Sequence, residues 1–208
     1  MGNRGDRPLS IAVLASGSGT NLQSIIDSCE SGRIPARVTA VISDVPEAHA
    51  LNRAARHGIS AHAVKRGDFA SKREFEERIV ELLREHGAEL VCLAGYMRIV
   101  GSTVLDAYPM RVMNIHPALL PSFPGLEGQR QALEYGVKVA GCTVHFVDAL
   151  ADHGPIIAQR AVEVHEGDTV DSLRERILAE EHRLYPLAIR LFAEGRLTVE
   201  GRIVIIRE

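Results

Sequence analysis

The alternation of short, almost wholly apolar runs with amphipathic stretches constrains the fold of this chain most. The apolar runs lie at 10–16, 38–43 and 90–96. Strands this apolar are usually buried on both faces of a sheet, because helices cover both sides of parallel strands. Helical stretches alternate with them at 21–32, 47–58 and 72–87, each ending in a glycine that can stop a helix. The pattern predicts an α/β fold: an open, twisted, mostly parallel, Rossmann-like sheet with helices on both faces.

The alternation of apolar runs and helical stretches continues toward the C-terminus. Apolar runs at 111–120, 139–150 and 154–164 precede a long helical stretch at 169–195, which Pro186 either bends or divides. Ile203 to Ile206 form either an added strand or a contact surface. The 208 residues fit a single domain over 1–208, with 1–9 as a flexible N-terminus.

Charge and composition exclude several classes of function. The chain has 24 Lys and Arg against 27 Asp and Glu, so no broad basic field attracts nucleic acid or an acidic membrane. Its apolar runs are far shorter than the roughly 20 residues that span a bilayer. The three cysteines form no CxxC pair, so neither a disulfide framework nor a thiolate zinc site is predicted. We therefore expect a soluble, cytoplasmic protein.

A glycine-rich turn, Ser16 to Asn21, follows the first run and opens a helix. Glycines let the backbone approach a ligand closely, and the free N–H groups of a helix start bind an anion. Leu22 stands where a dinucleotide fingerprint needs a small residue, and no Lys-Ser/Thr pair follows as in a P-loop. The turn thus favours one phosphomonoester; a plain tight turn capped by Thr20 or Asn21 is the alternative.

Asn114 and His116 lie at the carboxyl end of a predicted strand, where ligands sit in open α/β sheets. Two residues apart, their side chains share one face of the strand and can converge on one carbonyl group. A histidine that is merely hydrogen-bonded within the core is the alternative.

The segment 141–157 supplies two carboxylates, Asp148 and Asp152, beside a predicted turn at His153-Gly154. A carboxylate next to an imidazole favours the protonated ring and raises its pKa, and we assign that role to Asp152. Both aspartates are otherwise ordinary turn residues. His145 lines the site or fills the sheet surface. A zinc site from the histidines of this region is a minor alternative, because His116, His145 and His153 lack a known ligand spacing, so no metal is predicted.

Four motifs in this order carry a family resemblance. They are SGSGTNLQSIID, LAGYMRI, NIHPALLPSFPG and HFVDALADHGPII. From Ile11 to about Gly195 the chain resembles the phosphoribosylglycinamide formyltransferases of purine biosynthesis. That family moves a formyl group from 10-formyltetrahydrofolate to the amine of glycinamide ribonucleotide. The resemblance implies the formyltransferase fold, both small molecules as ligands and no metal; a homodimer is left open.

The resemblance also implies roles for single residues. Asn114, His116 and Asp152 match the catalytic trio. The substrate phosphate is assigned to Gly19, Thr20 and Asn21, and the ribose hydroxyls to Glu181. The folate ring is assigned to Met97, Arg98, Ile99, Val100 and Asn114, with the 147–152 loop, including Val147 and Asp148, as its cover. Lys72, or its neighbour Arg73, is assigned to the folate tail.

One departure from the family lies beside the trio. Where relatives often have Asp-Gly-Gly-Pro, this chain has Asp152-His153-Gly154-Pro155, which predicts a stiffer loop and an altered folate affinity. In the mechanism that we expect, Asn114 and His116 donate to the developing oxyanion. Asp152 keeps His116 protonated as the acid, and a water near Asp152 shuttles protons.

Three rival functions are weighed against this one. Formyltetrahydrofolate deformylase passes the formyl group to water and usually carries an extra N-terminal domain, whereas some ten residues precede the first strand here. Methionyl-tRNA formyltransferase carries a C-terminal domain for tRNA, for which the sequence leaves no room. A non-catalytic phosphate- or nucleotide-binding module predicts ligand protection without turnover.

Overall fold

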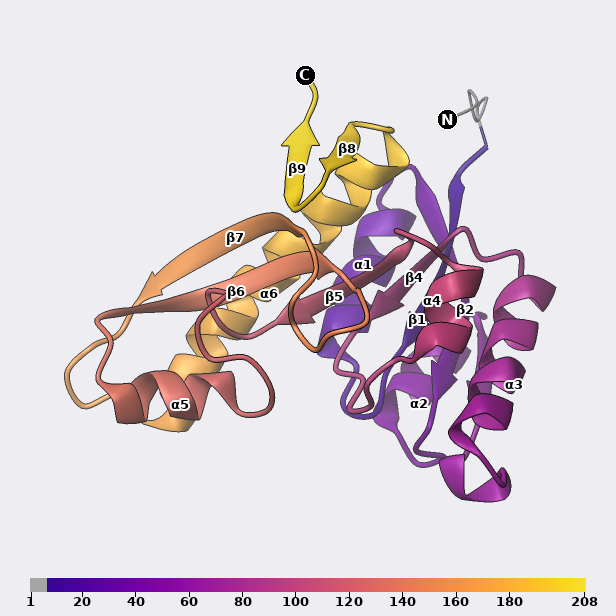
Figure 1. Cartoon of the computed structure of the whole chain (residues 1–208), viewed down its shortest axis with the longest axis horizontal. Coiled ribbons are helices and arrows are strands. Elements are labelled where there is room, and N and C mark those ends of the chain that lie inside the picture. The colour runs from indigo at the N-terminus through magenta and orange to yellow at the C-terminus, as the bar shows by residue number, and fades with distance from the viewer. Residues whose placement is uncertain (1–6) are drawn as a thin grey trace.

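A computed structural model describes residues 7–208, whose strands form one sheet in the order β3-β2-β1-β4-β5-β6-β7-β9-β8 (Figure 1). The strands are β1 Leu9–Leu14, β2 Ala36–Ser43, β3 Ser60–Ala63, β4 Leu90–Leu93, β5 Val112–His116, β6 Val139–Phe146, β7 Ile156–Glu163, β8 Leu197–Glu200 and β9 Ile203–Ile206. The helices are α1 Thr20–Glu30, α2 His49–Arg56, α3 Lys72–Glu85, α4 Ser102–Ala107, α5 Gly128–Tyr135 and α6 Val170–Ala193, with a 3-10 turn at Arg66–Asp68. The predicted α/β class and mostly parallel sheet are confirmed.

The sheet changes direction at β5. From β3 to β5 all neighbouring strands are parallel, whereas β6 is antiparallel to both β5 and β7. In Figure 1, β6 and β7 extend away from the parallel half, with α5 beside them and α6 running along both parts. The β8–β9 hairpin joins the sheet where Ile203 pairs in parallel with Ile156 of β7.

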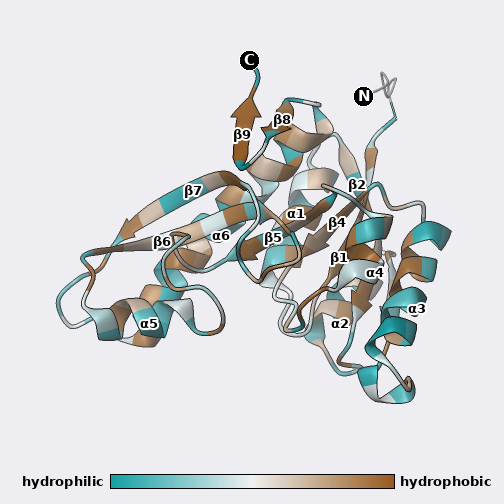
Figure 2. Ribbon diagram, in the orientation of Figure 1, coloured by the Kyte–Doolittle hydropathy of each residue, from teal (hydrophilic) through white to brown (hydrophobic). Residues whose placement is uncertain are grey.

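Side chains of β1 alternate between two buried layers. Ile11 and Val13 pack in the layer formed with α1, α2, α5 and α6. Ala12 and Leu14 pack on the opposite face, with α3 and α4. Because both faces are covered, the central strands are apolar throughout, and Figure 2 shows them brown between helices with teal outer surfaces.

Several boundaries differ from the predicted ones. Strand β3 was not predicted, because it is a short edge strand with largely exposed, small or polar side chains. The run 139–150 leaves the sheet after Phe146, and residues 147–155 form a loop. Pro186 lies inside the continuous helix α6, and 203–206 is a strand.

The predicted flexible segment 1–9 falls mostly outside the described residues. Leu9, its last residue, is instead the buried first residue of β1. Between residues 7 and 208, no helix combines the length and apolar character needed to cross a membrane.

Candidate active site

Strand register brings three predicted segments to one edge of the sheet. Leu14 of β1 is paired with Leu93 of β4, and Leu93 is paired with Asn114 of β5. The turn after β1, the segment after β4 and the end of β5 therefore leave the sheet side by side. The Ser16 N–H donates to the Gly95 carbonyl (3.0 Å), and the Met97 N–H donates to Ser16 Oγ (3.0 Å).

The glycine-rich turn ends at Gly19, which precedes α1 in the left-handed conformation (φ 71°). A Cβ atom there would lie 2.8 Å from Ala50 Cα, so only glycine lets the turn rest against α2. No side chain of residues 7–208 caps α1, so the cap by Thr20 or Asn21 that the alternative interpretation included is not formed. The first N–H groups of the helix therefore have no side-chain cap and suit an anion.

Arg53 adds a positive charge to this turn. Its Nε–H donates to the Ser18 carbonyl (2.9 Å), and Nη1 donates to Gln23 Oε1 (3.1 Å). The sequence interpretation missed Arg53, because it lies on α2, more than 30 residues from the turn, and only the packing of α2 against Gly19 reveals it.

Asn21 and Glu181 meet beside the turn, from α1 and α6. Asn21 Nδ2 donates to Glu181 Oε2 (2.7 Å), and both residues are buried. Burial raises the pKa of Glu181 to about 6, although the hydrogen bond from Asn21 lowers it in part. Asn21 Oδ1 and His182 Nε2 are buried without a hydrogen-bond partner among the described residues, and a ligand rich in hydroxyl groups can satisfy such atoms.

Asn114, His116 and Asp152 come together at the end of β5. Asn114 Nδ2 lies 3.5 Å from Asp152 Oδ1, and His116 Nδ1 lies 3.5 Å from Asp152 Oδ2. The His116 Nε2–H donates to the Phe123 carbonyl (2.8 Å), and the Gly125 N–H donates to Asp152 Oδ2 (2.8 Å). An amide, an imidazole and a carboxylate from segments 38 residues apart thus share one site.

His145 is a fourth member of this cluster. It pairs with Asn114 in the antiparallel β5–β6 register, and its Nδ1–H donates to the Phe146 carbonyl (2.8 Å). Its Nε2 lies 3.3 Å from Asn114 Nδ2 and 3.7 Å from Asp152 Oδ1, so the ring touches both groups. Sequence left the role of His145 open, because the direction of β6 relative to β5 was not readable from it.

The charge state of His116 is opposite to the one predicted. Burial lowers the pKa of His116, and the Phe123 carbonyl and the charge of Asp152 raise it without outweighing burial. Burial also raises the pKa of Asp152, but the interaction with the His145 ring, the Gly125 N–H and the neighbouring His116 imidazole leave it below its ordinary value. At pH 7 the resting site thus holds an ionised Asp152 beside a neutral His116.

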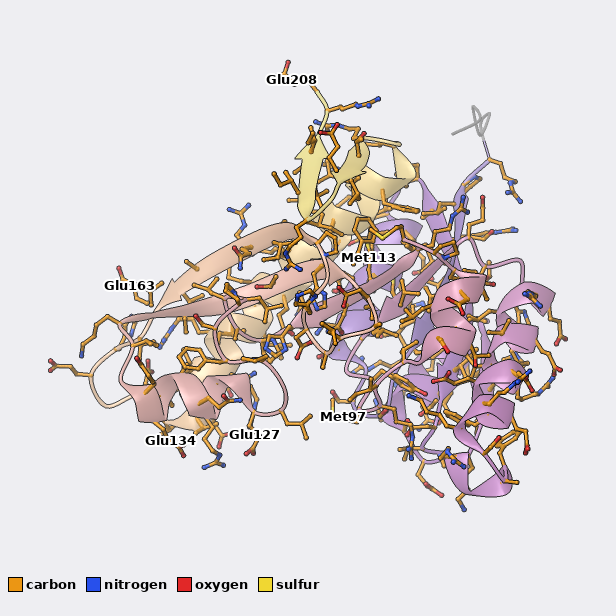
Figure 3. All side chains as sticks on the ribbon, in the orientation of Figure 1. Met97, Met113, Glu127, Glu134, Glu163 and Glu208 are labelled. Carbon is orange, nitrogen blue, oxygen red and sulfur yellow. The ribbon has the colours of Figure 1, made fainter. Side chains whose placement is uncertain are left out.

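A cavity of about 410 Å³ lies between α3, α4 and the segment after β4. Five of the predicted folate residues line it: Lys72, Met97, Arg98, Ile99 and Val100. Met97, labelled in Figure 3, is 64% exposed, so an apolar ligand surface can cover it. The cavity does not include Asn114, Val147 or Asp148.

Two charged residues frame this cavity differently. Arg98 Nε donates to Asp44 Oδ2 (2.6 Å), which fixes the segment to the end of β2. Lys72 Nζ lies 3.6 Å from Glu76 Oε1 at the cavity wall. Arg73 pairs instead with Glu77 and is 81% exposed, so Lys72 is the better placed of the two neighbours.

The loop 147–155 carries the remaining predicted residues. Val147 N–H donates to the Val112 carbonyl (2.9 Å), and its side chain packs with the α3–α4 layer. Asp148 accepts hydrogen bonds from the Leu150 N–H (3.0 Å) and from His153 Nδ1 (2.9 Å). His153 thus bonds to Asp148 and does not belong to the cluster of His116 and His145.

The chain is similar to known proteins over nearly its whole length. The formyl transferase family pattern matches residues 9–189. A phosphoribosylglycinamide formyltransferase of Bacillus subtilis is 44% identical over 179 residues, which cover 86% of this chain and 92% of that protein. The crystal structure of glycinamide ribonucleotide transformylase 1 from Symbiobacterium toebii superposes with a TM-score of 0.97 at 60% identity, covering 99% and 96% of the two chains. A formyltetrahydrofolate deformylase from Pseudomonas syringae gives a TM-score of 0.90 at 26% identity, covering 97% of this chain and 66% of the deformylase.

Proposed function

Because the chain belongs to the formyl transferase family and is a formyltransferase that acts on glycinamide ribonucleotide in purine biosynthesis, we propose how its own residues perform that reaction. The observation that carries the proposal is the convergence of Asn114, His116 and Asp152 within hydrogen-bonding or ion-pair reach at the carboxyl end of β5. Formyl transfer needs a donor for the developing oxyanion and a route for the amine proton, and these three groups supply both.

The ribonucleotide binds at the turn after β1. The N–H groups at Gly19, Thr20 and Asn21 hold its phosphate at the start of α1, and Arg53 adds a positive charge beside them. Glu181 accepts hydrogen bonds from the ribose hydroxyls, while Asn21 keeps its carboxylate oriented. This placement directs the substrate amine toward the end of β5, because the turn and β5 leave the same edge of the sheet.

The formyl donor is a folate, which we identify as 10-formyltetrahydrofolate. Its flat ring system suits the apolar wall formed by the exposed Met97 and Ile99 and the buried Val100, and Lys72 supplies a cation for an acidic tail. The loop that carries Val147 and Asp148 covers the ring, and no metal is needed. The bound folate supplies an activated formyl group; the protein residues orient it and move the protons.

In the transfer step, the amine attacks the formyl carbon and the carbonyl π bond opens. Asn114 Nδ2–H donates to the developing oxyanion, and His116 donates a second hydrogen bond or a proton. Since His116 rests neutral, it takes up a proton as the ligands bind, and the ionised Asp152 3.5 Å away stabilises the resulting imidazolium. A water held by Asp152 then takes the proton from the attacking amine and delivers it to the departing folate nitrogen, while the oxyanion re-forms the carbonyl π bond and the carbon–nitrogen bond to the folate breaks.

One assay separates this reaction from its rivals. Purified protein is mixed with the formyl donor, and folate release is followed with and without glycinamide ribonucleotide. We expect release that depends on the ribonucleotide and a product that carries the formyl group. Release of formate without the ribonucleotide would instead show a deformylase, and a thermal shift with both ligands but no turnover would show a binding module.

The cellular setting follows from the same chemistry. Both ligands are small, soluble metabolites, so we place the reaction in the cytoplasm, with no nucleic-acid or membrane partner. We treat 1–208 as one catalytic domain. The homodimer is kept as a proposal that light scattering of the purified protein decides.

A further inference from the structure

The C-terminal β8–β9 hairpin touches the loop that carries Asp152. Strand β9 meets β7 at the pair Ile203 and Ile156, which lie directly after the hairpin turn and directly after the loop. Arg202, in the hairpin turn, therefore faces the loop, and its Nη2 donates to the His153 carbonyl (2.7 Å). A residue some fifty positions from Asp152 along the chain is thus bonded to the backbone next to it.

The Arg202 guanidinium also contacts the His153 ring, which in turn contacts Asp148. His153 Nδ1 lies 2.9 Å from Asp148 Oδ2, and Arg202 Nη1 lies 3.0 Å from Nε2 and 3.2 Å from Nδ1 of the same ring. Asp148 in turn accepts the Leu150 N–H through its other oxygen (3.0 Å). Arg202, His153 and Asp148 together tie both arms of the loop to the hairpin.

Asp152 needs such support because its own backbone is unfavourable. It has a φ of 51°, in the left-handed region that few side chains other than glycine adopt readily. On its C-terminal side, Gly154 is pressed so closely against the Phe146 carbonyl that a Cβ atom there would overlap it. The Phe146 N–H donates to the Pro155 carbonyl (2.9 Å), which fixes this end of the loop to β6. His153, between these anchors and Asp152, is where Arg202 attaches.

We propose that Arg202 is a positioning residue for Asp152: by holding the His153 carbonyl, it keeps the Asp152 carboxylate within reach of His116 and Asn114. The proposal rests on the function proposed above, in which Asp152 takes part in proton transfer. It assigns a part in catalysis to a hairpin that contributes no side chain to the site itself.

The test compares three variants of the full chain. R202A removes the guanidinium, R202K keeps a donor that can reach the carbonyl, and R207A removes the same charge from the same hairpin at a position away from the loop. We expect kcat of R202A to fall about tenfold to a hundredfold, as for other small displacements of a reacting group, with KM for the ribonucleotide within about twofold of wild type. R202K should recover part of the loss, and R207A should match wild type.

Hydrogen exchange gives the readout that a general loss of stability would not. In R202A the amides of 147–155 should exchange faster, whereas those of β1, β4 and α6 should keep wild-type rates. His153→Ala keeps the carbonyl and removes only the ring, so it should lose less activity than R202A.

Three results would overturn the assignment: R202A with wild-type kcat, R202A with unchanged exchange in the loop, or H153A more damaging than R202A. If the wild-type protein itself showed no transfer to the ribonucleotide, the proposed function would fail. The exchange comparison would still decide whether Arg202 holds the loop.

Discussion

Asn114 has two side-chain neighbours, one on β6 and one in the loop that follows β6. Through Nδ2 it faces His145 at 3.3 Å and Asp152 at 3.5 Å, both long for hydrogen bonds. An amide with loosely engaged hydrogens can redirect one of them to a better acceptor at little energetic cost. The developing oxyanion is such an acceptor, because hydrogen bonds to charged groups are shorter and stronger than those between neutral groups.

Replacing Asn114 tests this donor directly. We expect N114A to lower kcat about a hundredfold to a thousandfold, the usual loss for one oxyanion donor, with an unchanged melting temperature. Steady-state kinetics and thermal unfolding measure the two quantities. The matched control is Asn52→Ala, an exposed asparagine on α2, and an N114A rate within threefold of that control would contradict the assignment.

Glu181 predicts a pH dependence of substrate binding. Its pKa is raised to about 6 by burial, so it loses its charge as pH falls through that value, and a protonated carboxyl accepts hydrogen bonds poorly. KM for the ribonucleotide should therefore rise below about pH 6 in wild type. In E181Q it should be raised at all pH values and nearly flat between pH 5 and 8. A wild-type KM that stays constant down to pH 5 would remove Glu181 from the ribose site.

The same shift acts on stability. A carboxyl whose folded-state pKa is raised binds its proton more tightly when folded, so its contribution to stability is present at low pH and is lost as pH rises through about 6. At pH 8 the free energy of unfolding of E181Q should therefore exceed that of wild type by about 2 kcal/mol, as measured by urea unfolding. The difference should vanish near pH 4.

His116 shows where residue-level prediction from sequence fails. The neighbour that raises its pKa, Asp152, is predicted correctly by sequence, and the two groups lie 3.5 Å apart. The larger effect is burial, which depends on how β5, β6 and the 117–125 loop enclose the ring. The burial of the His116 ring depends on residues that are far apart in the sequence, so a short motif does not predict it.

At the scale of elements, the apolar runs indicated β6 and β7 as well as the central parallel strands, but they did not indicate that β6 is antiparallel to its neighbours. The cores of β1, β2 and β4 are apolar runs because both faces are buried, and that is a local signal. Strand β3 carries no such signal, since it lies at an exposed edge. The antiparallel direction of β6 relative to β5 depends on the path of residues 117–138, which include α5. The pattern of apolar residues in that stretch does not predict this direction.

The turn before α1 makes a prediction at this scale. Gly19→Ala forces a side chain into the left-handed region and against the backbone of α2, whereas Gly17→Ala, two residues earlier, meets open space. We expect G19A to raise KM for the ribonucleotide at least about tenfold and to cost about 1–3 kcal/mol of stability. Kinetics and urea unfolding of the pair measure this, with G17A near wild type; two indistinguishable variants would contradict the packing argument.

At the scale of the molecule, one buried layer joins the two halves of the sheet. It runs from Ile11 and Ile25 in the parallel half to Val144, Phe146 and Tyr185 near the antiparallel half. The Tyr185 hydroxyl shares its single hydrogen between the carbonyls of Leu93 (3.1 Å) and Met113 (2.9 Å), so α6 contacts both β4 and β5. We therefore propose that the two halves fold as one unit.

Calorimetry tests whether the two halves of the sheet unfold together. We expect a single unfolding transition with equal calorimetric and van't Hoff enthalpies. The chain contains no tryptophan, so Tyr135→Trp, at an exposed position of α5, places a local fluorescent probe in the antiparallel half. Its midpoint should coincide with that of circular dichroism, and an earlier fluorescence transition would mean that the two halves unfold separately.

The change of strand direction at β5 has a mechanical consequence. Asn114 has a parallel neighbour, Leu93, on one side and an antiparallel neighbour, His145, on the other. A ligand bound at Asn114 is therefore attached to the parallel and the antiparallel regions of the sheet at the same time. We therefore expect a bound ligand to reduce sliding of the parallel region past the antiparallel region along the line between β5 and β6.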